Sequence, residues 1–154
     1  LLAVLLVGCS KDSTETLAQS AESYLAKGDW KSAIIQLKNL LQQSPDDGPA
    51  RLLLGKAYLE NQEYLLAESE LRRALELDQP ADQVMPALAR AMLGRGEAQK
   101  LLDEFGTVRL LDRTAIAEFR GSLGDAYLRT GKRDEARAQY EAALAARSDN
   151  RRAR

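Results

Sequence analysis

A unit of about 34 residues recurs along this 154-residue chain, and no other feature constrains the possible fold as strongly. Small residues mark the repeat at intervals of 34, 34 and 35 positions: Ala21, Gly55, Ala89 and Gly124. A large side chain follows three positions after each of them: Tyr24, Tyr58, Met92 and Tyr127. Twelve positions after each small residue comes a further apolar residue: Ala33, Ala67, Leu101 and Ala136. Four copies in phase indicate a protein built by repetition of one supersecondary unit.

Each unit contains two short amphipathic stretches in which apolar residues are three and four positions apart, the period of an α-helix. A single helix pair cannot bury its apolar face alone, so neighbouring pairs must stack. The second unit carries the residue types of the tetratricopeptide repeat at the matching positions: Leu54, Gly55, Tyr58, Ala67 and Leu71. The chain therefore resembles this family, which implies an all-α fold, a right-handed superhelical solenoid of antiparallel helix pairs.

The repeat spacing also predicts the domain boundaries. We expect four repeats within residues 14–150, at about 14–47, 48–81, 82–116 and 117–150, followed by the start of a further repeat at 151–154. The third repeat is irregular, because proline restricts helix formation and glycine favours helix ends. We expect Pro86 to delay its first helix and Gly106 to shorten its second.

The first ten residues have the composition of a targeting signal. The apolar run that opens the chain is too short to cross a bilayer, which requires about 20 residues, but it is typical of the end of a signal peptide. The sequence Leu6-Val7-Gly8-Cys9 resembles the lipobox of bacterial lipoproteins, in which a lipid is attached to the cysteine thiol. The other interpretation is a buried cysteine in an uncleaved apolar helix.

The lipobox interpretation divides this end of the chain into residues 1–8, the end of a signal peptide, and residues 9–13, a lipidated Cys9 and a short tether. Acyl chains bind membranes at about 0.8 kcal/mol per buried methylene, so several chains hold a protein firmly. Ser10 directly after the cysteine is consistent with sorting to the outer membrane. We therefore expect a lipid-anchored protein of the bacterial envelope that faces the periplasm.

The amino-acid sequence of two segments resembles that of a narrower family. The run Tyr24-Leu25-Ala26-Lys27-Gly28-Asp29-Trp30 and the irregular third unit around Leu101-Leu102-Asp103-Glu104-Phe105 are similar to the PrsT repeat lipoproteins of the PEP-CTERM/exosortase (XrtA) system. This resemblance implies an envelope scaffold linked to exopolysaccharide, with protein or peptide partners that include polysaccharide-synthesis proteins. A second hypothesis is an outer-membrane lipoprotein of a secretion machine, either pilotin-like or a polysaccharide-export component. A third places an enzyme in a further domain.

The composition argues against catalysis within these residues. The chain has no histidine and one cysteine, so it lacks both the commonest general base and a thiolate cluster for zinc. Its 22 basic and 23 acidic residues are balanced, whereas nucleic-acid binding requires a clustered basic surface. We expect no catalytic residue, no metal site, no cofactor and no nucleic-acid partner.

The first helices of stacked pairs line a concave surface, which predicts a binding groove. The position after each repeated small residue should face it: Glu22, Lys56, Arg90 and Asp125. Three positions further on, every unit has a leucine: Leu25, Leu59, Leu93 and Leu128. An amphipathic groove of this kind suits an extended peptide or a partner helix. The interpretation that we favour for the leucines is packing against the adjoining helix, and for Trp30 packing across its turn.

Overall fold

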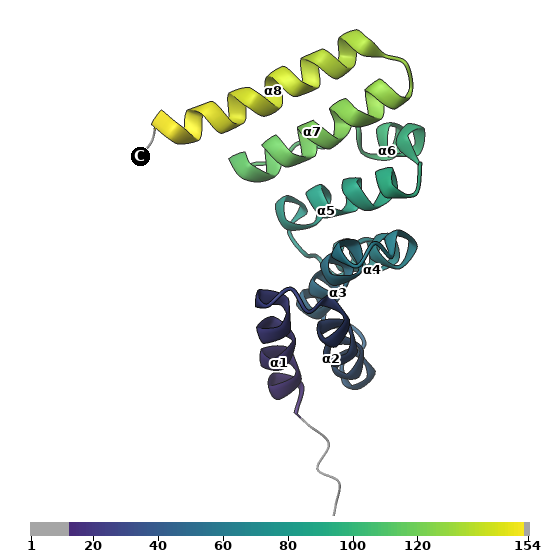
Figure 1. The fold of residues 1–154 in the computed structure, drawn as a ribbon, viewed down its shortest axis with the longest axis vertical. Helices are drawn as coiled ribbons and strands as arrows, with labels where there is room; N and C mark the ends of the chain where they lie inside the picture. The colour runs from purple at the N-terminus through teal and green to yellow at the C-terminus, as the bar shows by residue number, and fades with distance from the viewer. Residues whose placement is uncertain (1–12, 153–154) are drawn as a thin grey trace, which may run out of the picture.

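The computed structural model describes residues 13–152, with side chains through residue 148, and lipobox residues 6–9 lie outside this range (Figure 1). The described backbone forms eight α-helices and no strand. Their bounds are α1 (Thr14–Ala26), α2 (Trp30–Gln43), α3 (Gly48–Glu60), α4 (Tyr64–Glu76), α5 (Ala81–Gly94), α6 (Ala98–Phe105), α7 (Arg113–Arg129) and α8 (Arg133–Arg152).

The helices form four pairs that stack in chain order. Helices α1 and α2 run close to vertical in Figure 1, whereas α5, α7 and α8 run close to horizontal, so the stack twists along its length. Each pair contacts its neighbours: α2 lies against α3, α4 against α5, and α5 against α7. The expected all-α solenoid of helix pairs is confirmed.

The turns inside the pairs share one backbone conformation. A residue with positive φ ends each first helix: Gly28 (73°), Gln62 (62°), Gly96 (80°) and Gly131 (80°). Glycine adopts this left-handed conformation without the steric cost that a Cβ atom adds. Gln62 shows that the turn itself, and not the glycine, is what recurs.

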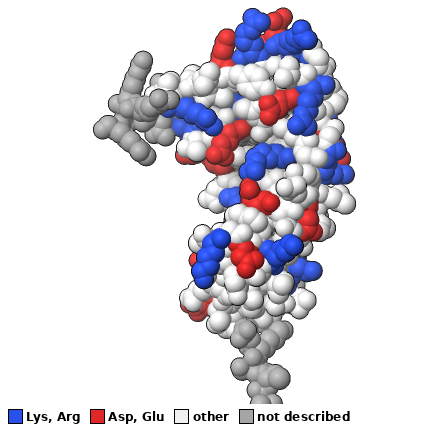
Figure 2. Space-filling model, viewed as in Figure 1, with Lys and Arg blue, Asp and Glu red and all other residues white. Residues whose placement is uncertain are grey.

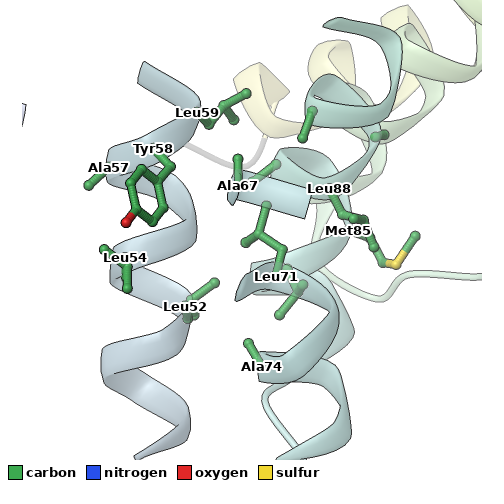
Figure 3. Close-up of a cluster of buried hydrophobic side chains, with 14 of the residues drawn as sticks. Leu52, Leu54, Ala57, Tyr58, Leu59, Ala67, Leu71, Ala74, Met85 and Leu88 are labelled. Carbon is green, nitrogen blue, oxygen red and sulfur yellow. The ribbon is translucent and has the colours of Figure 1, made fainter. Parts of the chain in front are cut away.

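Two of the repeated small residues, Gly55 and Gly124, lie where the helices of a pair approach each other closely. A Cβ atom built on Gly55 would lie 2.6 Å from Cγ of Leu71, and one on Gly124 would lie 2.5 Å from Cε1 of Tyr140. Real Cβ atoms do not approach other heavy atoms so closely. Leu71 is fully buried and lies between α3 and the α5 residues Met85 and Leu88 (Figure 3). The glycine on the first helix therefore lets a large side chain of the second helix pack against it, and Leu71 reaches the core in this way.

The third unit differs from expectation at its first helix. Pro86 does not delay α5, which begins at Ala81 and contains the proline as a buried residue. A proline at this position removes the helical hydrogen bond that its nitrogen would donate to the carbonyl of Asp82, and its ring crowds that carbonyl, but the buried face of α5 holds the helix together. The expectation for Gly106 is confirmed, because α6 ends at Phe105 after eight residues with Gly106 as its C-cap.

The fourth pair is longer than the repeat spacing predicts. Helix α7 begins at Arg113, four residues ahead of the expected boundary at 117, and α8 continues to Arg152. Asp112 starts α7 by accepting a hydrogen bond from the backbone N–H of Ala115 at 2.8 Å. The backbone N–H groups of Leu111 and Asp112 donate in turn to Oδ1 of Asp82, at 2.8 and 3.1 Å. A side chain from the start of α5 thus fixes the start of α7.

Two glycines three residues apart in α7 give a matched test of the close approach. We expect Gly124→Ala to lower the free energy of unfolding by about 1 kcal/mol or more, because overpacking against Tyr140 costs about 1–3 kcal/mol. Gly121→Ala should raise it by about 0.5–1 kcal/mol, because nothing lies within 4 Å of the new Cβ atom and alanine favours the helix. Urea denaturation of both variants measures the difference, and equal effects would contradict the packing argument.

Candidate binding groove

The first helices α3, α5 and α7 border two open hollows. One, of about 490 Å³, is lined by Trp30, Lys56, Leu59, Glu60, Asp82, Gln83, Pro86, Ala87, Arg90, Asp112, Thr114, Ala115 and Glu118. The other, of about 400 Å³, is lined by Leu59, Glu60, Gln62, Tyr64, Arg90, Leu93, Gly94, Ser122, Asp125 and Arg129. Because they share Leu59, Glu60 and Arg90, they form one continuous depression, which we call the α3–α5–α7 groove.

Five of the eight residues predicted for a groove line it: Lys56, Leu59, Arg90, Leu93 and Asp125. Glu22 and Leu25 lie on α1 and do not border either hollow, and neither does Leu128. Helix α1 therefore contributes no residue to the groove, and the first pair reaches it only through Trp30 at the start of α2.

The leucines behave mainly as core residues. Leu59 and Leu93 are only 4% and 6% exposed, and Leu25 is half-buried against the core. Leu128, at the equivalent position of the fourth unit, is 53% exposed. Leu59 and Leu93 are thus buried, as the packing interpretation holds, whereas Leu25 is partly covered and Leu128 is exposed.

Most charged groups in the groove already have partners. Nη1 of Arg90 lies 3.0 Å from Oε1 of Glu60, across the junction of the two hollows. Nη1 of Arg129 donates to the carbonyl oxygen of Leu93 at 2.6 Å. The hydroxyl of Tyr140 donates to Oδ1 of Asp125 at 2.6 Å, so this carboxylate is already engaged. These contacts order the groove wall and leave few of its charges open to a ligand.

Several groove residues were not predicted as such. Asp82, Asp112 and Glu118 give the wall near the start of α5 and α7 an acidic character. The sequence marked the two aspartates only by their positions at helix starts. The hydrogen bond that brings them together joins residues 30 positions apart, which repeat spacing does not predict. Trp30 borders the hollow while its ring lies beside the turn, where Cζ2 would be 3.9 Å from a Cβ atom on Gly28. Its packing across the turn and its place at the groove are compatible.

A second cluster of charges surrounds Glu68 on α4, which is only 3% exposed. Its carboxylate accepts from Nε of Arg72 at 2.8 Å and from Nη1 of Arg95, and Nζ of Lys100 lies 3.5 Å away. Burial alone would raise the pKa of Glu68, but the hydrogen bonds from Arg95 and Arg72 and the charge of Lys100 outweigh it and lower the pKa. An ionised and fully paired carboxylate has no proton to donate, and it is a poor base.

The partners of Glu68 are themselves linked. Arg72 also pairs with Glu104 at 2.7 Å, and its guanidinium carbon lies 5.3 Å from the ring centroid of Phe105. Arg95 pairs with Glu97 at 2.9 Å. The cluster therefore joins α4 of the second unit to the third unit, and its role is structural.

The described residues contain no group of three or more histidine, cysteine, aspartate and glutamate side chains that could hold a metal ion. Over the same part of the chain, no helix has both the length and the apolar character that a membrane span requires. The face in Figure 2 interleaves basic and acidic side chains and carries no broad patch of one sign.

Comparison with known proteins agrees with the geometry. Two family models, each described as tetratricopeptide repeat, match residues 24–91 and 122–154. Among curated proteins, no sequence matches the chain significantly.

Solved structures of MamA have the same fold. The crystal structure of MamA superposes with a TM-score of 0.74 at 23% identity, over 93% of this chain and 83% of the other. MamA MSR-1 C2 gives a TM-score of 0.76 at 18% identity, over 92% and 81%. A further MamA crystal structure gives 0.59 at 20% identity, over 90% and 94%. At these identities the likeness establishes the fold alone.

The Glu68 cluster generates a stability prediction. Glu68→Gln should lower the free energy of unfolding at neutral pH by about 1–3 kcal/mol, because it leaves partly buried cations without their shared carboxylate. Since the folded pKa of Glu68 is lowered, its contribution is present at neutral pH and is lost as the pH falls. The difference between wild type and variant should therefore shrink below about pH 4.

Glu76→Gln is the matched control, because Glu76 pairs with Arg73 at 2.8 Å on an exposed surface. Chemical denaturation across pH measures both variants. An equal loss from the two substitutions would contradict a special role for the buried carboxylate.

The Tyr140–Asp125 contact predicts an unusual tyrosine titration. The hydrogen bond to Asp125, with burial and the charge of that carboxylate, raises the pKa of Tyr140 to about 12. Asp125→Asn should lower this pKa, because it removes the negative charge. Absorbance of tyrosinate during an alkaline titration reports it, and Tyr140→Phe identifies which step belongs to this residue.

The raised pKa also fixes the direction of the pH effect on stability. The unfolded tyrosine ionises near its ordinary value of about 10, so the contribution is complete below that pH and is lost as the pH rises towards 12. A wild-type titration without a late step that Tyr140→Phe removes would contradict the contact.

Proposed function

Because this chain is a solenoid of tetratricopeptide repeats, we propose that it is a non-catalytic scaffold that holds protein partners in the α3–α5–α7 groove. The observation that carries this proposal is the continuous groove lined by three successive first helices. Stacked repeats present extended surfaces of this kind to macromolecular partners. The ion pairs in its wall are engaged in structure, and no arrangement of an acid, a base and a nucleophile stands in it.

We place this scaffold on the bacterial envelope, anchored by lipid on Cys9 to the outer membrane and facing the periplasm. The support is the sequence Leu6-Val7-Gly8-Cys9-Ser10, which precedes the described helices. Helix α1, which follows residues 9–13 in the sequence, lies at the end of the solenoid away from the fourth pair. Anchoring there would leave the groove of the later pairs away from the membrane surface.

The narrower proposal is a role in the PEP-CTERM/exosortase system, where the scaffold would gather proteins that make or export an exopolysaccharide matrix. Its support is the similarity of the Tyr24–Trp30 and Leu101–Phe105 runs to the PrsT lipoproteins. In the structure, this irregular third unit has a short α6 of eight residues, followed by a loop.

A pull-down from native envelope tests the proposal, with the full-length lipidated protein as bait and mass spectrometry as the readout. We expect exosortase substrates or polysaccharide-synthesis proteins with the wild type. Recovery of pilus or export-pore subunits instead would contradict this system and favour the secretion-machine hypothesis. Cys9→Ser should release the protein from the membrane fraction, and unchanged fractionation would contradict lipid anchoring.

A variant that fills the groove separates groove binding from other contacts. Thr114 is an exposed groove residue, so Thr114→Trp should reduce recovery of partners without disturbing the core. Ser69→Trp, at an exposed position of α4 outside the groove, is the matched control. If both variants recover the same partners as the wild type, those partners do not bind in the groove.

A further inference from the structure

We propose that the ligand of the α3–α5–α7 groove is an extended polypeptide segment that carries one acidic and one basic side chain about five residues apart. This inference rests on the proposed function and specifies its partner. It follows from which charges of the larger hollow are already engaged, how far apart the others lie, and what forms the floor between them.

Two charged residues of the larger hollow have no partner within the described residues: Lys56 on α3 and Glu118 on α7. Every other charged side chain that lines this hollow is engaged. Glu60 and Arg90 pair with each other, and Asp82 and Asp112 accept hydrogen bonds from backbone N–H groups. The open charges are therefore one cation and one anion, and they lie on opposite sides of α5.

The two open charges set a length for the ligand. Helix α5 contacts both α3 and α7, so it lies between the helices that carry Lys56 and Glu118. Packed helices have axes about 8–10 Å apart, so the two outer helices lie up to about 16–20 Å apart across α5. An extended chain advances about 3.3 Å per residue. An acidic side chain at Lys56 and a basic one at Glu118 are thus separated by about five residues.

The floor between these charges favours an extended backbone. Pro86, Ala87 and Ala115 are small and apolar, and the two alanines are buried, so a chain can approach the helix surfaces closely. The Glu60–Arg90 pair lies at the junction with the second hollow. A partner helix is about 10–12 Å in diameter, whereas an extended chain is narrower and needs less room beside this pair. Small apolar side chains of the ligand fit this floor.

The charges also give the complex a polarity. The acidic residue of the ligand lies towards α3 and its basic residue towards α7, and the adjacent carboxylates of Asp82 and Asp112 strengthen the preference for a cation at that end. A ligand with two charges of the same sign meets repulsion at one end. Selectivity by such charge placement acts through repulsion of wrong partners as much as through attraction of the right one.

Selection from a phage-displayed library of random ten-residue peptides tests the inference, with the Thr114→Trp variant used to define background. We expect enriched peptides to carry Asp or Glu and Lys or Arg about five residues apart, with small apolar residues between them. The most enriched peptide is then synthesised, and its affinity is measured by fluorescence anisotropy. Lys56→Glu and Glu118→Lys should each weaken binding about tenfold, since each replaces attraction by repulsion.

Charge reversals outside the groove are the matched controls: Lys38→Glu on α2 and Glu141→Lys on α8, both at exposed positions. These should leave the affinity unchanged. In the double variant Lys56→Glu/Glu118→Lys, a peptide with its acidic and basic residues exchanged should bind more tightly than the original peptide. This rescue distinguishes charge recognition from loss of folding.

The outcomes separate the inference from the function on which it rests. Enriched peptides that lack the charge pattern, or that bind the charge-reversed variants as well as the wild type, would overturn the inference and leave peptide binding by the groove intact. Absence of enrichment above the Thr114→Trp background would overturn both.

Discussion

The close approach of two helices at the repeated glycines, Gly55 and Gly124, is the constraint on which the rest of this structure depends. Gly55 and Gly124 allow the side chains of Leu71 and Tyr140 to cross the space that a Cβ atom would occupy. That contact sets the distance between the helices of a pair. Leu71 also packs against α5 of the next unit, so the same side chain links two units (Figure 3). Because each pair packs on its neighbours in the stack, the small rotation from one unit to the next adds along the chain and produces the twist.

The third unit shows how the solenoid tolerates an irregular repeat. Helix α6 has only eight residues, so it offers less apolar surface than α2 or α4. The cluster around Glu68 adds polar contacts between α4 and this unit, and Asp82 connects the start of α5 to the start of α7 through two backbone hydrogen bonds. Charged and capping contacts thus supplement packing where the second helix is short. The buried carboxylate of Glu68 holds neighbouring units together through its arginine partners. These same contacts account for its lowered pKa.

The sequence predicted the features that depend on the repeat period. It did not predict the features that depend on contacts between residues far apart in the chain. The helical pairs, their turns and the short α6 follow from spacing and from the conformational preferences of glycine. The effect of Pro86 was predicted wrongly, because the buried apolar contacts of α5 outweigh the hydrogen bond and the steric contact that a proline inside a helix costs. The buried state of Leu59 and the exposed state of Leu128 could not be separated, since both stand at the same repeat position.

The same distinction applies to the groove. The position of the groove followed from the repeat, so five of its residues were predicted. Which of its charged side chains are paired did not follow from the repeat. Glu60 and Arg90 are 30 positions apart and neutralise each other, whereas Lys56, only four residues from Glu60, has no partner among the described residues. A count of charges along the chain gives no preference for an anionic or cationic ligand. Once the Glu60–Arg90 pair is set aside, a cation is left at α3, and the anion Glu118 is left at α7 with the helix-capping carboxylates of Asp82 and Asp112. The selectivity of the groove therefore lies in the order of charges along a bound chain.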